Sequence, residues 1–200
     1  MIFQWICDFI ARALMAIFAQ NLVFTGGYGL CELLRVAARP KKLLMFCGVL
    51  SFFSTFGAGV DFLFSARLGF SELNYNFRML IFVLAVAVLY LAVVLVVFLF
   101  NKKSFKQLWK IISLAAFNSA VLVVPFANYK LGNDFGSSVL LGVTAGIGFF
   151  FAALLVQSGL KRLHNPDMPP AFRGIPAAFI YIGILSLVFL GIEGRLFMVF

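Results

Sequence analysis

Long runs of apolar residues are the feature that most constrains this chain. The clearest is Arg78 to Phe100, RMLIFVLAVAVLYLAVVLVVFLF, which holds no charged residue after its first position. A helix needs about 20 predominantly apolar residues to cross a bilayer, and six segments of this kind run about 3–23, 43–65, 79–100, 108–128, 136–160 and 175–198. Only 12% of the 200 residues are charged, and the mean hydropathy is +1.08. The sequence therefore predicts an all-α integral membrane protein with six transmembrane helices.

The same composition limits which functions the chain can have. The net charge of +9 would suggest nucleic acid in a soluble protein, but here the basic residues lie between apolar runs. Cys7, Cys31 and Cys47 lack CxxC spacing, which argues against a disulfide framework and against a zinc site within the chain. No nucleophile–base arrangement, phosphate loop or pair of carboxylates is present in the sequence, so we expect no catalysis by this chain alone.

Basic residues are distributed unevenly between the predicted helices, and cytoplasmic connections carry the excess of Lys and Arg in membrane proteins. Eleven lie in the first, third and fifth connections: Arg35, Arg39, Lys41, Lys42, Lys102, Lys103, Lys106, Lys110, Lys161, Arg162 and Arg173. Five lie on the other side: Arg12, Arg67, Arg78, Lys130 and Arg195. The sequence therefore predicts both termini outside the cytoplasm, with Trp5 and Trp109 as interfacial anchors.

Glycine interrupts the first predicted span, where an apolar helix should continue. Gly26, Gly27 and Gly29 lie between Asn21 and Cys31. Broken backbone within a bilayer is tolerated only where protein or a lined cavity satisfies the freed N–H and C=O groups. Transporter-like folds place mid-membrane sites at such breaks. Cys31 is then either a small buried side chain or a ligand.

The order of the spans predicts an inverted repeat. Two successive sets of three spans cross the membrane in opposite senses, so we expect inverted three-helix repeats of about 1–100 and 104–200 within a single membrane domain, 1–200. Asn118 lies near the middle of the fourth span, as Asn21 lies in the first. The pattern predicts a broken first helix in each half, with both asparagines satisfying freed backbone groups around a shared pseudo-twofold site.

Other polar and small residues have simpler interpretations. Gly142, Gly146 and Gly148 form a GxxxG-like ridge, which predicts close helix packing. Asp61 and Glu193 lie near span ends, where each can reach an interface. The sequence therefore favours interfacial positions for these carboxylates over a cation path.

Short segments, taken in chain order, resemble a known family. Asn21, with Gly29-Leu30-Cys31 and the basic turn Pro40-Lys41-Lys42 after it, is similar to the first half of the A/E-type membrane subunits of the Rnf and NQR complexes. Asn118 with Ala120-Val121-Leu122 resembles the family's Asn-Cys-Ala-Val-Leu segment. Residues 170–176, PAFRGIP, resemble the family's Pro-x-x-Phe-Arg-Gly-x-Pro entry to the last span. The basic first connection and the predicted outside termini are most similar to the A-type member of the Rnf complex.

The resemblance implies a membrane subunit of an ion-translocating electron transport complex in the prokaryotic inner membrane. In the family, two homologous subunits of opposite topology each contribute cysteines to a [2Fe–2S] cluster within the membrane, beside flavin- and cluster-bearing subunits. The expected partners are therefore a membrane chain of the Rnf E or NQR D type, the other members of the complex and lipid. By this resemblance Cys31 is a cluster ligand, and Asn21 and Asn118 lie beside the cofactor. The chain is then part of a translocase rather than an enzyme by itself.

One position departs from the family pattern. Ser119 stands where the family has its second ligand cysteine, and a serine oxygen is a harder and less acidic ligand than a thiolate. Three interpretations stay open: an unusual cluster with Ser119 or another ligand, a cluster completed by partner cysteines, and a cluster-free structural paralogue. In the last case Ser119 is a packing hydroxyl bonded to the carbonyl four residues back. A small secondary transporter with inverted repeats is a further alternative.

Overall fold

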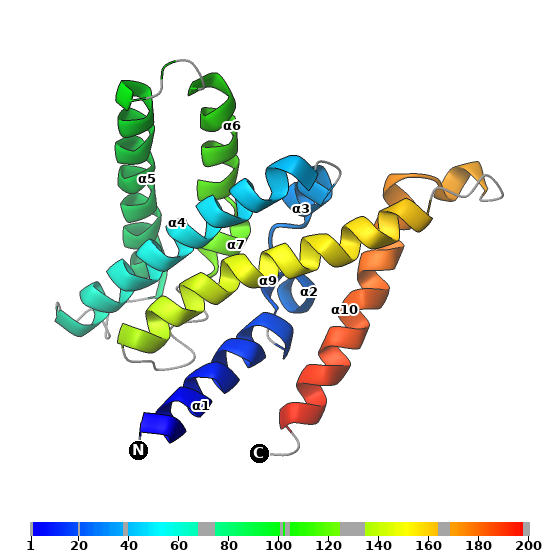
Figure 1. Ribbon diagram of the computed structural model, residues 1–200, viewed down its shortest axis with the longest axis horizontal. Helices are drawn as coiled ribbons and strands as arrows, with labels where there is room; N and C mark the ends of the chain where they lie inside the picture. Colours follow the sequence, from blue (N-terminus) through cyan, green and yellow to red (C-terminus); the bar gives the residue numbers. More distant parts are fainter. Residues whose placement is uncertain are drawn as a thin grey trace. The chain divides into compact units, whose positions relative to one another are not determined.

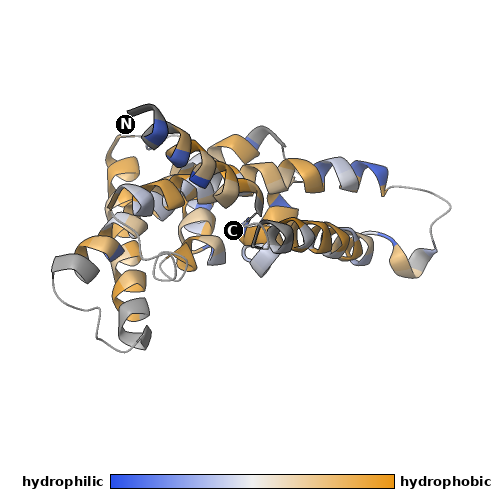
Figure 2. Ribbon diagram, turned by 90° about the horizontal axis from the view of Figure 1, so that it is seen from below, coloured by the Kyte–Doolittle hydropathy of each residue, from blue (hydrophilic) through white to orange (hydrophobic). Residues whose placement is uncertain are grey.

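A computed structural model describes residues 2–19, 21–37, 40–67, 75–100, 102, 105–124, 135–163 and 169–197. Every regular element in these residues is a helix (Figure 1). Within the described ranges, four helices are long and apolar enough to cross a membrane: Lys42–Leu63 within α4 (Pro40–Arg67), Leu80–Phe100 within α5 (Tyr75–Phe100), α9 (Phe135–Arg162) and Ile175–Ile192 within α10 (Ile175–Phe197). Apolar residues cover most of the length of the long helices (Figure 2). The all-α membrane class is therefore confirmed, with four of the six predicted spans.

Of the basic residues used for the topology, Arg39, Lys103 and Lys130 lie outside the described residues.

The first and fourth predicted spans are interrupted helices. α1 (Ile2–Leu14) continues into a π-helical turn, Met15–Ala19, and the chain then forms α2 (Leu22–Gly26) and α3 (Leu30–Ala37). α6 (Phe105–Ala116) ends before the short α7 (Ser119–Leu122). These helix ends place the predicted interruptions at Asn21 and at Asn118. The first one follows a π-turn, a rare feature that frequently marks functional sites.

The chain forms two compact units, which we describe separately. The first comprises Met1–Leu43 with Gly148–Phe200, and the second comprises Leu44–Ile147. α9 therefore contributes its first part to the second unit and the rest to the first.

Aromatic contacts join the helices of the first unit. α10 packs against α2 and against the π-turn. The rings of Phe24 and Phe189 stack with centroids 4.6 Å apart, and Phe18 meets Phe151 edge-on at 4.8 Å. The C-terminal part of α9 is tied to the same core because the Tyr181 hydroxyl of α10 donates to the main-chain carbonyl of Leu155 at 3.3 Å. A second cross-link joins α9 to the end of α3, where Gln157 Nε2 donates to the Ala37 carbonyl at 3.2 Å.

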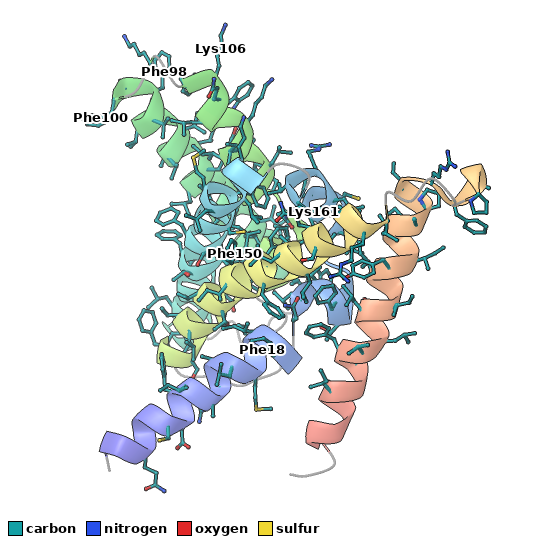
Figure 3. All side chains as sticks on the ribbon, turned by 45° about the vertical axis from the view of Figure 1, so that its right-hand side comes forward. Phe18, Phe98, Phe100, Lys106, Phe150 and Lys161 are labelled. Atoms are coloured by element: carbon teal, nitrogen blue, oxygen red, sulfur yellow. The ribbon has the colours of Figure 1, made fainter. Side chains whose placement is uncertain are left out.

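In the second unit, α5 and α6 lie side by side as an antiparallel hairpin (Figure 1). Near its closed end, where Figure 3 labels Phe98 and Lys106, the Phe98 ring meets the Phe105 ring at 5.3 Å. Further along, Trp109 Nε1 donates to the Tyr90 hydroxyl at 2.8 Å, and Ser113 Oγ donates to the Trp109 carbonyl at 2.8 Å. Because the Ser113 hydroxyl has only one proton, the 2.8 Å contact between Tyr90 and Ser113 must be a donation by Tyr90. These three side chains therefore close a ring of hydrogen bonds between the two helices.

α4 and α9 also pack closely in the second unit, through the predicted glycine ridge. A Cβ on Gly142 would collide with the backbone of Thr55, and one on Gly146 would collide with Ser51. The expected GxxxG-like close approach is therefore confirmed for these two glycines. One face of α5 is open in the described part of the chain: Leu84, Val88, Leu91 and Leu95 are each more than half exposed. In a membrane such a face meets lipid or another apolar helix.

Candidate functional site

Asn21 organises the first helix break. It is the N-cap of α2, with 1% of its surface exposed, and its Oδ1 accepts a hydrogen bond from the Val23 N–H at 3.1 Å. Its Nδ2 donates to the carbonyl of Ile17 at 2.9 Å and to the carbonyl of Gly148 at 3.0 Å. Both amide protons are thus used, one on a carbonyl of the π-turn and one on α9. Asn21 therefore satisfies freed backbone groups at this break, as the sequence predicts.

Two glycines reverse the chain between Asn21 and Cys31. Gly27 has φ 71° and caps α2, because its N–H bonds the Val23 carbonyl at 2.9 Å. Gly29 has φ 79° and its carbonyl accepts the Leu33 N–H at 2.9 Å, which starts α3. Positive φ values of this kind are accessible to glycine without the steric cost of a Cβ. The pair places Cys31 in the first turn of α3.

Cys31 is exposed. It is therefore not the small buried side chain that was the simpler interpretation of this thiol. Of the other two cysteines, Cys7 on α1 is also exposed and Cys47 on α4 is buried.

Asn118 organises the second break in the same way, but with one difference. It is the N-cap of α7 and is 2% exposed, and its Oδ1 accepts from the Ala120 N–H at 2.8 Å. Its Nδ2, however, is buried and has no hydrogen-bond partner among the residues that the structure describes. Ser119, the next residue, is exposed at the first position of α7. The local cap was therefore predictable, whereas the unpaired amide N–H groups were not.

Sequence reasoning treated Cys31, Ser119, Asn21 and Asn118 as one shared site. Asn21 and Cys31 belong to the first unit, and Asn118 and Ser119 belong to the second. The shared site therefore stays a prediction. Among the described residues, no three His, Cys, Asp or Glu side chains gather as metal ligands would.

The sequence does not reveal two contacts that the structure shows. The main-chain carbonyl of Gly148 accepts from Asn21, whereas the sequence pattern predicts only a packing role for Gly148. The indole N–H of Trp109, a predicted interfacial anchor, donates to the Tyr90 hydroxyl on the neighbouring helix. A main-chain acceptor has no side-chain signature, so the sequence carried no direct signal of the first contact.

These features define a class of protein: a helical integral membrane protein with two asparagine-capped helix breaks. The family described as "Rnf-Nqr subunit, membrane protein" matches residues 9–196, and the chain belongs to this family. The resemblance inferred from the short segments is thereby confirmed.

Named relatives match over nearly the full length. The A-type subunit of the ion-translocating oxidoreductase complex of Colwellia psychrerythraea is 27% identical over 188 residues, which cover 94% of this chain and 97% of the relative. Its counterpart in Histophilus somni, of the same name, is 29% identical with the same coverage. The counterpart in Shigella boydii is 28% identical over 187 residues, again covering 94% of this chain and 97% of the relative.

Proposed function

We propose that this chain is the A-type membrane subunit of an ion-translocating electron transport complex of the Rnf kind. The observation that carries the proposal is the match over 94% of the chain to relatives named as the A-type subunit of the ion-translocating oxidoreductase complex. Cys31 after the first break and Ser119 after the second are both exposed, so each is accessible to a partner subunit. This exposure supports a role within a complex. Its partners are then an oppositely oriented sister subunit, other subunits of the complex and lipid.

The chain is further proposed to be an inverted repeat of two three-helix halves, with six spans. Asn118 follows Asn21 by 97 positions (118 minus 21), and both are N-caps that accept from the N–H two residues on. The same shift carries α4 onto positions 137–164, which overlap α9 at Phe135–Arg162, and both helices have 28 residues. It carries α5 onto positions 172–197, which overlap α10 at Ile175–Phe197.

The composition of the two units agrees with the proposed inverted repeat. The first unit joins the broken helix of the first half to α9 and α10, while the second joins the broken helix of the second half to α4 and α5. α10 packs on α2 and on the π-turn in the first unit, and α5 packs on α6 in the second, which supports a pseudo-twofold relation between the halves. With the basic connections in the cytoplasm, the chain crosses the inner membrane with both termini outside.

Whether a [2Fe–2S] cluster fits this chain depends on the ligand atoms that the chain offers. Cys31 offers an exposed thiol, which is the ligand type that iron–sulfur clusters take. Ser119, at the position of the family's second ligand, offers only a hydroxyl. Cys31 therefore fits a cluster that takes one thiolate from this chain and its remaining ligands from partner cysteines.

In that arrangement the cluster supplies a one-electron relay within the membrane. The role of this chain is to hold one ligand at a rigid helix start, with Gly27 and Gly29 fixing the turn that precedes it. Asn21 keeps the break itself intact by satisfying the carbonyls of Ile17 and Gly148. A cluster-free structural role is the second candidate, and the specific observation in its favour is the hydroxyl of Ser119 at the second ligand position.

The test is iron and acid-labile sulfide content of the purified complex, with EPR after dithionite reduction, on wild type and Cys31→Ala. Cys7→Ala is a matched control, since Cys7 is likewise exposed but lies on α1, away from the break. We expect a reduced [2Fe–2S] signal that is lost in Cys31→Ala and kept in Cys7→Ala. An unchanged signal in Cys31→Ala would exclude this chain from the relay and leave the structural role.

A further inference from the structure

The closed end of the α5–α6 hairpin carries a group of lysines. Lys102 lies two residues after the end of α5, and Lys106 and Lys110 lie on α6, where a spacing of four residues puts them on one helix face. All three residues are exposed. Lys106 and Phe98 lie together at this end of the hairpin (Figure 3). We call Lys102, Lys106 and Lys110 the hairpin lysines.

The charge of the hairpin lysines is not neutralised by the sequence around them. Residues 73–133 hold no Asp or Glu, but they hold six basic residues: Arg78, Lys102, Lys103, Lys106, Lys110 and Lys130. In the described part of the chain no ion pair involves a hairpin lysine, whereas Arg35 of the first connection pairs with Glu32 at 3.5 Å. The closed end of the hairpin therefore attracts an anionic partner.

The open face of α5 leads to these lysines. Its exposed residues alternate in spacing by four and three positions, as residues on one helix face do: Leu84, Val88, Leu91 and Leu95. The same spacing continues through Phe98, which is 47% exposed, to Lys102 in the turn after the helix. Lys102 Nζ lies 5.9 Å from the centroid of the Phe98 ring, a cation–π distance. One continuous surface is thus apolar along α5 and cationic at its end.

A phospholipid matches both parts of this surface. Among the four candidate spans of the described residues, the span in α5 has the smallest buried share, 11%, against 22%, 44% and 50% in the others. In a membrane, acyl chains can therefore contact most of its length. Trp109 is 45% exposed and stacks on Phe105 with centroids 6.4 Å apart, and tryptophan is typical of the headgroup level. A phospholipid carries chains and a phosphate in one molecule, whereas a soluble anion matches only the lysines.

We propose that the hairpin lysines and the open face of α5 bind an anionic phospholipid. Its phosphate contacts the lysine ammonium groups, which bind phosphate as point charges, and one acyl chain lies along Leu91 and Leu95. The site uses no residue of either helix break, so it goes beyond the electron relay and does not depend on it. It is a specific headgroup position, in addition to the general contact of the spans with lipid.

The test is native mass spectrometry of the purified full-length chain in non-ionic detergent, with added lipid. Dioleoyl phosphatidylglycerol and dioleoyl phosphatidylcholine have the same chains, so they differ only in headgroup charge. The variant changes the three hairpin lysines: Lys102→Gln, Lys106→Gln and Lys110→Gln. The matched control removes three exposed basic groups of the first unit: Lys42→Gln, Lys161→Gln and Arg162→Gln.

We expect the wild-type chain to bind phosphatidylglycerol more tightly than phosphatidylcholine. The lysine variant should lose about tenfold in phosphatidylglycerol affinity, because each basic residue near an anionic lipid contributes to binding, and the control variant should keep its affinity. Equal affinity of the wild type for the two lipids would overturn the proposal, and so would an equal effect of the two variants. Both variants change only exposed side chains, so thermal unfolding should match the wild type.

Two further results separate a lipid from other anionic partners. sn-Glycerol 3-phosphate has a phosphate but no chains, so it should not bind detectably at the lipid's concentration; binding as tight as that of the lipid would overturn the role of α5. A lysine variant that keeps its lipid affinity but fails to assemble with the other subunits would overturn the lipid site and assign the lysines to an acidic surface of a partner subunit.

Discussion

The side-chain amide of Asn21 donates to the main-chain carbonyl of Gly148, 3.0 Å away and 127 residues further along the chain. The same amide group holds the Ile17 carbonyl of the π-turn. One side chain therefore joins the first break to α9, whereas the amide protons of its counterpart Asn118 meet no acceptor in the described part of the chain. The two breaks have the same local cap but different connections to the helices around them.

This difference predicts that the same substitution, asparagine to serine, lowers the free energy of unfolding more at the first break than at the second. Serine is also a good N-cap residue, so Asn21→Ser and Asn118→Ser both keep a cap oxygen while the carboxamide, with its NH₂ donors, is replaced by a hydroxyl. Asn21→Ser leaves the carbonyls of Ile17 and Gly148 without a donor, which should lower the free energy of unfolding by about 1–3 kcal/mol. Asn118→Ser should change the unfolding free energy of the isolated protein by less than about 0.5 kcal/mol, since it removes no bond.

The measurement is denaturant or thermal unfolding of the purified protein in detergent. Equal destabilisation by the two variants would contradict the assigned hydrogen bonds.

A second prediction concerns the glycines of α9. Gly142→Ala and Gly148→Ala both add one methyl group, but with different neighbours. At Gly142 the Cβ would meet the backbone of Thr55, which cannot move aside without separating the helices. At Gly148 it would lie 3.3 Å from Asn21 Nδ2, a side-chain atom that can shift slightly. We expect a loss of about 2–3 kcal/mol for Gly142→Ala and about 1 kcal/mol for Gly148→Ala.

Gly183→Ala on α10 is the matched control, because nothing lies within 4 Å of its Cβ position. It should be neutral or stabilising by up to about 1 kcal/mol, since alanine has the higher helix propensity. Thermal unfolding of the three variants checks the order. A Gly142→Ala protein as stable as Gly183→Ala would disprove the close approach of α4 and α9.

Much of this architecture could be predicted from the sequence, and the reason is physical. Apolar runs fix where membrane helices lie, and a glycine cluster after an asparagine marks a break because few other residues take positive φ, as Gly27 and Gly29 do. The partners across the fold were harder to predict. Asn21 binds a backbone carbonyl, and every residue except the chain's last offers one, so no sequence pattern distinguishes Gly148 as the acceptor. The burial of Asp61 was likewise misjudged, because a position near a span end does not reveal the helix that covers it.

A third prediction concerns the α5–α6 hairpin. Tyr90→Phe removes the hydroxyl that accepts from Trp109 and donates to Ser113, so it breaks two bonds of the hydrogen-bonded ring. Trp109→Phe removes only the indole N–H donor and keeps an aromatic ring beside Phe105. Each should cost about 0.5–1.5 kcal/mol, and the double variant should cost less than the sum because the two share a bond. A double-mutant cycle by thermal unfolding measures this coupling, and a coupling energy of zero would contradict the bond between Trp109 and Tyr90.

The last prediction concerns the three thiols. Maleimide reagents need an accessible thiol, and in the purified single protein Cys7 and Cys31 are exposed whereas Cys47 is 6% exposed. We expect rapid labelling of the first two and labelling of Cys47 only after unfolding. In the assembled complex Cys31 should become unreactive, because the proposed function gives it a ligand and a partner, while Cys7 should stay reactive. Peptide mass spectrometry after labelling assigns each site, with Cys7→Ala and Cys31→Ala identifying the adducts. Persistent labelling of Cys31 in the intact complex would show that this thiol neither binds iron nor faces a partner. A structural role would then be the remaining function proposed for this chain.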